Sequence, residues 1–302
     1  MRWLRHVLPF VGCPLNHGAS YCPFFVVGSG RSGNTLIRRI LYAHKDLHIP
    51  PETYVLGHII KLFYENRNMG WGDLVRLILA EFEYHQEFST FEIPSLRPLV
   101  HQLSNVSKEK RSLAYVLNTF YSYHAEVHDV DYKRWGDKSP LNAYVMDDIY
   151  KVFPDAQFIH LLRDGCDVVY SYLQSGHYQS IESAAHRWTS ALQAARTFMH
   201  RHPEACIEVR YEALVSTPES TVEQICRFLG IDYHPNIIDR CDVAQAMGDV
   251  HQYAHHQNVQ QPINTKSIGK GRRNLTEEQK LKLEALIGKQ LRDVGYDSII
   301  SY

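Results

Sequence analysis

The stretch Pro23–Leu41, which reads PFFVVGSGRSGNTLIRRIL, decides the fold of this chain of 302 residues. Its first part, Pro23–Val27, is a continuous apolar run of aromatic and β-branched side chains, which is typical of a strand buried on both faces. A glycine-rich turn follows at Gly28–Thr35, and apolar residues then recur at helical spacing, at Leu36, Ile37, Ile40 and Leu41. The stretch therefore predicts a strand, a tight loop and a helix.

Two more buried strands are predicted further along the chain. Phe158–Leu162 is the next predicted strand and passes through Arg163-Asp164-Gly165 into a helical pattern, and Cys206–Val209 is the third. Because these strands alternate with helices, the sequence predicts an α/β fold around a central, mostly parallel sheet flanked by helices.

Three places combine the residues that begin helices. Ser139-Pro140 and Thr217-Pro218 each place a capping hydroxyl before a proline, and Thr276–Gln279 has the pattern of a capping box. We expect a helix to start at each of them, with Ser139 as the first cap.

Two stretches do not follow this alternation. Residues 55–135 are mostly helical in pattern and rich in Tyr, Phe and His, so they predict an insertion that could cover a substrate cleft. Residues 242–273 are polar, contain His251, His255, His256 and Gln257–Gln261, and predict a long loop.

Composition excludes several classes of protein. The chain has 32 Lys and Arg against 33 Asp and Glu, a net charge of -1, which disfavours general binding to nucleic acid or to an anionic membrane. The apolar stretch Val7–Cys13 is too short to cross a bilayer, and no other segment resembles a membrane span. The six cysteines form no Cys-x-x-Cys pair, so we expect mostly reduced thiols.

The loop Gly28-x-x-x-x-Gly33, between a strand and a helix, is typical of phosphate binding through backbone N–H groups, although an ordinary strand-to-helix turn can share the pattern. A nucleotide triphosphatase loop continues with Lys and then Ser or Thr. Here Asn34-Thr35 stand in those places and Arg31 lies inside the loop. The missing lysine argues against an ATPase or GTPase.

Three motifs stand out along the chain: Gly30–Leu36, Leu162–Gly165 with Ser171, and Arg210–Leu214. Together they resemble motifs of the sulfotransferases, which use 3′-phosphoadenosine 5′-phosphosulfate (PAPS). Gly30–Leu36 resembles their 5′-phosphosulfate loop, and Leu162–Gly165 with Ser171 resembles the motif that binds the 3′-phosphate. Arg210–Leu214 is similar to a segment whose tyrosine lies near the adenine. The order and spacing match across residues 23–230, and each motif follows a predicted strand, where ligands bind in such sheets.

The resemblance implies a P-loop-like three-layer fold and one sulfotransferase domain over residues 1–302, with the insertion at about 55–135 and a basic loop and helix at about 262–296. It implies that the cofactor is held by the residues Gly30, Arg31, Ser32, Gly33, Asn34, Thr35, Arg163, Ser171 and Tyr211. Within the basic run Lys266–Arg273 it points to Ser267 and Lys270. The residues agree, because Arg31 and Arg163 supply two separate anion sites. The alternative for Arg163 is an ion pair with Asp164 or Asp167.

Sulfuryl transfer needs a base for the acceptor proton and a cation at the leaving oxygen. In the tyrosylprotein branch of the family a Glu-Thr pair supplies the base, which the resemblance carries to Glu52 in Pro51-Glu52-Thr53. Lys138-Ser139-Pro140 resembles the element that carries the cation, which implies this role for Lys138. The alternative is that both are solvent-exposed side chains beside helices. No metal is expected, because the sulfuryl group carries a single charge.

Other interpretations remain. A kinase or NTPase with a degenerate loop, and a relative that binds nucleotide without turnover, are the alternatives. His124 and His128 are one helical turn apart but have no identifiable third metal ligand. The expected acceptor is a hydroxyl of a carbohydrate, a metabolite or a peptide tyrosine. We expect a cytoplasmic enzyme, because the cofactor is made in the cytosol.

Overall fold

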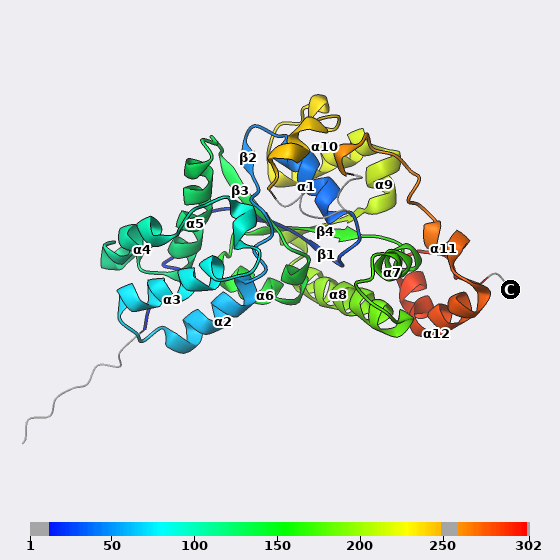
Figure 1. Ribbon diagram of the computed structural model, residues 1–302, viewed down its shortest axis with the longest axis horizontal. Coiled ribbons are helices and arrows are strands. Elements are labelled where there is room, and N and C mark those ends of the chain that lie inside the picture. Colours follow the sequence, from blue (N-terminus) through cyan, green and yellow to red (C-terminus); the bar gives the residue numbers. More distant parts are fainter. Residues whose placement is uncertain (1–11, 249–258, 301–302) are drawn as a thin grey trace, which may run out of the picture.

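The computed structural model describes residues 12–248 and 259–300. Its centre is a sheet of five parallel strands in the order β2-β3-β1-β4-β5. The strands are β1 (Phe24–Gly28), β2 (Leu47–His48), β3 (Arg134–Lys138), β4 (Gln157–Leu162) and β5 (Cys206–Arg210). The predicted α/β class with a parallel sheet is therefore confirmed. Because β1 lies between β3 and β4, the loop that follows it opens at the middle of the sheet edge (Figure 1).

Alternate residues of β1 pack into different layers. Phe24 and Val26 belong to a core shared with α1 (Asn34–Tyr42), α9 (Tyr211–Ser216) and α10 (Pro218–Leu229). Phe25 and Val27 face the opposite core, which contains residues of α2 (Leu56–Asn66), α3 (Trp71–Glu83), α4 (Arg97–Ser104), α5 (Leu113–Val127), α6 (Met146–Val152) and α8 (Ile181–Arg201). Helices thus cover both faces of the sheet, as strands buried on both faces require.

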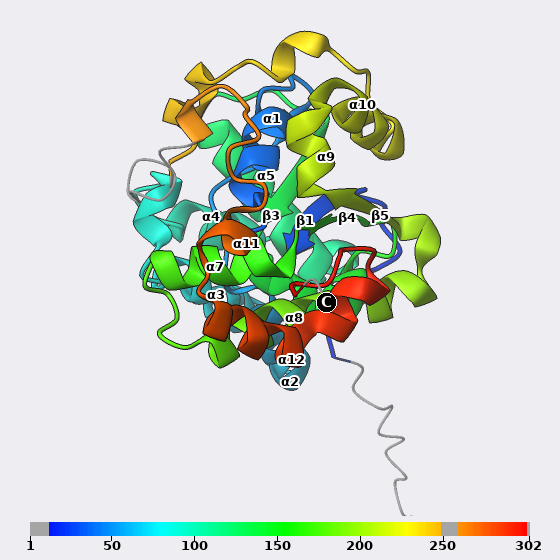
Figure 2. The same cartoon turned by 90° about the vertical axis from the view of Figure 1, so that its right-hand side faces the viewer.

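A third apolar cluster joins α7 (Gly165–Gln174) and α8 to α12 (Glu277–Asp293). Figure 2 shows the orange segment after residue 259 running down from the α1 side of the sheet to α11 (Lys270–Asn274), which lies on α7. The chain between residues 262 and 275 therefore returns to the helix that begins at the end of β4.

Sequence reasoning missed β2 and β3, which bracket the helices α2 to α5. Strand β2 has two residues, and β3 reads RWGDK, with Trp135 as its one large apolar side chain. Neither shows the apolar run by which a buried strand is recognised. Lys138 consequently ends a strand, whereas the sequence placed it only before a helix start.

The expected helix starts had mixed outcomes. Thr276 and Gln279 form the predicted capping box, with bonds of 3.2 and 2.9 Å. Helix α10 begins at Pro218 as predicted, but the Thr217 hydroxyl donates back to the Ala213 carbonyl instead of capping it. The prediction for Ser139 is confirmed only in part: a 3₁₀ helix, Pro140–Tyr144, begins after Ser139, but the Ser139 side chain does not cap it and α6 starts only at Met146.

The stretch 242–273 is less of a loop than expected, because it contains a 3₁₀ turn at Asp242–Ala246 and most of α11. Its histidines His251, His255 and His256, with Gln257, lie outside the described residues. Two fully buried arginines of α1 donate to backbone carbonyls within this stretch. Arg38 donates to the Met247 carbonyl at 3.0 Å, and Arg39 donates to the carbonyls of Val259 and Gln261 at 3.0 and 3.1 Å.

Within residues 12–248 and 259–300, no helix has both the length and the apolar character needed to span a membrane.

Candidate active site

The loop after β1 is built around glycines that no other residue could replace without displacement. Gly28 has φ 144°, and a Cβ there would lie 2.5 Å from the carbonyl oxygen of Leu161 in β4. Gly33 has φ 97°, and its Cβ would lie 2.5 Å from a ring carbon of Tyr211. Gly33 is also the N-cap of α1 and offers no side chain to the first N–H groups of the helix. These N–H groups can therefore receive an anion.

Four other loop residues of the candidate set have distinct surroundings. Gly30 lies against Tyr172, whose hydroxyl oxygen would be 2.6 Å from an added Cβ. Ser32 is buried, and Asn34 donates from Nδ2 to the Ser29 carbonyl at 2.9 Å. Thr35 is the second residue of α1. The loop is thus held by a hydrogen bond between Asn34 and Ser29, and it packs against Tyr172 of α7.

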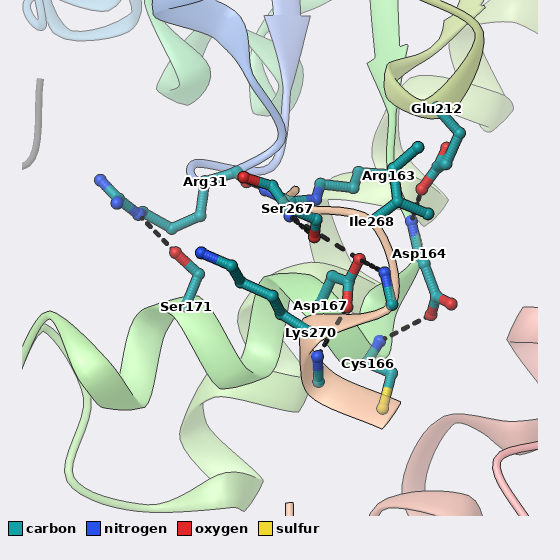
Figure 3. A network of polar contacts seen from close by, with 12 residues as sticks. Arg31, Arg163, Asp164, Cys166, Asp167, Ser171, Glu212, Ser267, Ile268 and Lys270 are labelled. Carbon is teal, nitrogen blue, oxygen red and sulfur yellow. Dashed lines mark hydrogen bonds and ion pairs between the residues drawn. The ribbon is translucent and has the colours of Figure 1, made fainter. Parts of the chain in front are cut away.

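Arg31 lies within this loop, and its backbone is in the left-handed region, with φ 67°. Its Nε donates to the Ser171 hydroxyl of α7 at 3.1 Å (Figure 3). Burial lowers the pKa of Arg31, and the nearby positive charge of Arg163 acts in the same direction. Two guanidinium groups held near one another favour the binding of anionic groups beside them.

Arg163 connects three segments at the end of β4. It donates to the carbonyl oxygens of Arg31 and Ser267, each at 2.9 Å, and its Cζ lies 4.3 Å from the centre of the Tyr211 ring. Its Nε is buried and has no hydrogen-bond partner among the described residues. A buried donor that lacks an acceptor is costly, so this atom fits an anionic ligand.

Of the two ion pairs proposed as an alternative for Arg163, the one with Asp167 is present and the one with Asp164 is not. Asp167 lies 3.7 Å from the Arg163 guanidinium, while Asp164 pairs with Arg272 at 2.8 Å. Trp188 donates to the Arg163 carbonyl at 3.1 Å and so fixes its backbone. Arg163 is therefore oriented mainly by backbone acceptors, and its charge is only loosely compensated.

Asp167 holds the C-terminal basic loop against α7. Its two carboxylate oxygens accept the backbone N–H groups of Gly269 and Gly271, at 2.8 and 2.7 Å. Figure 3 shows the result: Ser267 lies beside Arg163, and the Lys270 side chain points toward Ser171. The predicted residues Ser267 and Lys270 are thus brought to the Arg31–Ser171 contact. Sequence reasoning weighed Asp167 only as an ion-pair partner, because a carboxylate that binds backbone N–H groups leaves no motif.

Glu52 and Lys138 form a buried ion pair. Lys138 is the last residue of β3, and its Nζ contacts Glu52 Oε1. The Lys138 side chain is fully buried and that of Glu52 is 11% exposed, which contradicts the alternative of two surface side chains. Lys138 is paired with Val26 of β1, two residues before the glycine loop opens at Gly28. The pair therefore lies on the edge of the sheet where that loop begins.

The two histidines considered as metal ligands, of which His124 is buried and His128 half-buried, have other partners. His124 Nδ1 lies 3.0 Å from His48 Nε2, and His128 Nε2 lies 2.8 Å from the Phe91 carbonyl. Burial lowers the pKa of His48 to about 4 and that of His124 to about 2. In the described part of the chain, no group of three or more His, Cys, Asp or Glu side chains is arranged to hold a metal ion.

Known proteins resemble this chain over most of its length. The model of the sulfotransferase family matches residues 23–235. A putative protein-tyrosine sulfotransferase of Caenorhabditis briggsae is 24% identical over 281 residues, covering 91% of this chain and 89% of the relative. Protein-tyrosine sulfotransferase 1 of Danio rerio is 24% identical over 284 residues, covering 90% and 72%.

Solved structures share the fold. The sulfotransferase domain from the Synechococcus PCC 7002 olefin synthase superposes with a TM-score of 0.59 at 21% identity, covering 90% of this chain and 96% of that domain. The sulfotransferase domain from the curacin biosynthetic pathway gives 0.55 at 18% identity, covering 92% and 98%. The family model spans the glycine loop, the end of β4 and the Tyr211 segment together. This chain therefore belongs to the sulfotransferase family and is a sulfotransferase-family enzyme.

Proposed function

We propose that this protein transfers a sulfuryl group from PAPS to a hydroxyl acceptor. The observation that carries the proposal is the grouping of cationic side chains from three separate segments at one sheet edge, where Arg163 contacts both the loop of Arg31 and the segment of Ser267. The nucleotide has two anionic ends, and the edge offers a place for each. We assign the 3′-phosphate to Arg163, Ser171, Ser267 and Lys270, and the phosphosulfate to the loop Gly30–Thr35 with Arg31. Tyr211, beside both, is assigned to the adenosine.

The catalytic roles follow from the buried pair. PAPS supplies a sulfuryl group on a good leaving group. Glu52 Oε1 contacts Lys138, which leaves Oε2 to accept the proton of an acceptor hydroxyl. Lys138 places its positive charge where negative charge develops on the leaving oxygen. The loop N–H groups at Gly33 and the start of α1 hold the equatorial oxygens.

Calorimetry tests the nucleotide assignment. We expect adenosine 3′,5′-bisphosphate to bind tightly and ATP to bind weakly, because the second anion site suits a 3′-phosphate. Tighter binding of ATP would overturn the proposal in favour of a kinase or NTPase.

Two variants separate an enzyme from a relative that only binds nucleotide. Glu52→Gln and Lys138→Ala are expected to abolish transfer while leaving the affinity for adenosine 3′,5′-bisphosphate largely intact. Transfer at the wild-type rate would remove both residues from the catalytic assignment, and no transfer by the wild-type protein to any acceptor class would support the binding-only relative.

The acceptor, the domain boundaries and the compartment complete the proposal. The names of the relatives put peptide tyrosine first among the acceptors to screen, ahead of carbohydrates and hydroxylated metabolites. We take residues 1–302 as one domain with a helical insertion at about 55–135. A cytoplasmic location is supported by the cysteines, because all six lie in the described part of the chain and all are free thiols.

A further inference from the structure

Asp137, the penultimate residue of β3, is a fully buried carboxylate. Its Oδ2 accepts hydrogen bonds from the Thr53 hydroxyl and from the Tyr121 hydroxyl, both at 2.9 Å, and its Oδ1 accepts from Asn142 Nδ2 at 2.6 Å. A buried carboxylate is costly unless such donors surround it. The three donors come from three different segments, so Asp137 joins parts of the chain that are far apart in sequence.

These contacts tie the segment that carries Glu52 to β3. Glu52 and Thr53 are consecutive, and so are Asp137 and Lys138. Lys138 contacts Glu52 while Asp137 accepts from Thr53. In addition, the Thr53 backbone N–H donates to the Ser139 hydroxyl at 3.1 Å. Glu52 and Thr53 are therefore held by three consecutive residues, 137–139, at the end of β3.

The Glu52 segment needs these contacts because no regular element holds it. Residues 51–55 lie in neither a helix nor a strand, and Tyr54 takes a left-handed φ of 59°. Thr53 is 2% exposed, so its hydroxyl faces no solvent that could replace Asp137. A carboxylate acts efficiently as a base only when it is held in a fixed position relative to the proton that it accepts, and this requires a fixed backbone.

We propose that Asp137 is a positioning residue which, through the Thr53 hydroxyl, holds Glu52 against Lys138. The inference rests on the proposed function, because it presumes that Glu52 and Lys138 act on the transferred group. It assigns no contact with substrate to Asp137 itself.

The chain offers a matched pair of variants for the test. Thr53→Val and Tyr121→Phe each remove one hydroxyl from the same oxygen of Asp137, but Thr53 alone is joined to Glu52. We expect the two variants to lose similar amounts of thermal stability. We expect Thr53→Val to lower kcat by roughly 10- to 100-fold, as small misplacements of reacting groups do, and Tyr121→Phe to lower it by less than about threefold. Thr53→Ser, which keeps the hydroxyl, should restore kcat to within about threefold of the wild type.

Crystal structures of the two variants give a second readout that does not require a known acceptor. In Thr53→Val we expect the Glu52 carboxylate to leave Lys138, and in Tyr121→Phe we expect it to stay. Binding of adenosine 3′,5′-bisphosphate should be unchanged in both, because neither residue belongs to the nucleotide site.

The outcomes separate this inference from the proposed function. Equal losses of kcat in Thr53→Val and Tyr121→Phe, or an undisturbed Glu52 in the structure of Thr53→Val, would overturn the positioning role. If Glu52→Gln transfers sulfuryl groups at the wild-type rate, the catalytic assignment fails first. If Glu52→Gln is inactive and Thr53→Val is fully active, only the present inference fails.

Discussion

Removing one member of the Glu52–Lys138 pair should destabilise the protein more than removing both. Lys138 is completely buried and the Glu52 side chain is 11% exposed, so either residue alone would be a desolvated charge. Loss of one partner of a buried pair costs about 3–5 kcal/mol, whereas replacing both by uncharged groups of similar volume is often close to neutral. We therefore expect about 3 kcal/mol each for Lys138→Met and Glu52→Gln.

The double variant is expected to lose no more than about 2 kcal/mol, against a sum of about 6 kcal/mol for the two single variants. Urea unfolding at pH 7 measures the three free energies of unfolding, and each single variant should also lower Tm by roughly 6–12 °C. All three variants should be inactive in sulfuryl transfer, so the double variant should regain stability without regaining activity. If the two single effects add to within about 0.5 kcal/mol, the charges do not interact and the contact is not a working ion pair.

Three further outcomes are expected. Arg163→Lys loses the planar fork that contacts two backbone carbonyls, so the Kd of adenosine 3′,5′-bisphosphate should rise roughly 10- to 100-fold in calorimetry; an unchanged Kd would place the 3′-phosphate elsewhere. Gly33→Ala would place a Cβ 2.5 Å from an aromatic carbon of Tyr211 at a residue with φ 97°, and it should abolish binding of adenosine 3′,5′-bisphosphate. Gly176→Ala, at φ 71° with nothing within 4 Å of the added Cβ, should lower stability alone. Equal nucleotide binding by the two variants would refute the close approach of Gly33 to Tyr211. Burial lowers the pKa of His48 from 6.5 to about 4 and that of His124 from 6.5 to about 2, so below pH 6.5 the unfolded chain takes up protons first. The stability present above pH 6.5 is therefore lost as pH falls toward 4, at roughly 1.4 kcal/mol per pH unit for each histidine. His124→Phe should flatten this slope in urea unfolding, and an identical slope would contradict the assignment.

The parts of the fold that can be predicted from the sequence are those whose residues all lie in one kind of surroundings. Residues 23–27 and most of 158–162 are apolar because both faces of their strands are covered. The loop after residue 27 contains glycine because Gly28 approaches β4 closely and Gly33 has a left-handed φ. In contrast, β3 is polar because it carries Asp137 and Lys138, which a core strand accommodates only through specific partners. Strand composition is a poor guide wherever a strand also carries a buried polar network.

The candidate site divides in the same way. Arg31 and Arg163 could be assigned to one edge, because the carboxyl ends of parallel strands meet there. The loop of Lys270 could be assigned to it only through the family resemblance. The contacts of Asp137 and Asp167 could not, because their partners are a hydroxyl 84 residues away and two backbone N–H groups about a hundred residues away. Ser139 illustrates the same limit: its hydroxyl accepts from Thr53, and local sequence had favoured a helix cap.

The two buried arginines of α1 have a consequence for how the protein is made. Helix α1, which follows the glycine loop, is synthesised before the segment that completes its contacts, because Arg39 donates to the carbonyls of Ile238, Val259 and Gln261. Until Gln261 has been synthesised, the guanidinium group of Arg39 lacks at least one of these three carbonyl acceptors. We therefore expect the proposed nucleotide site to be completed only after Gln261 has been synthesised, and nascent chains that stop short of this residue should be unable to retain a bisphosphate nucleotide.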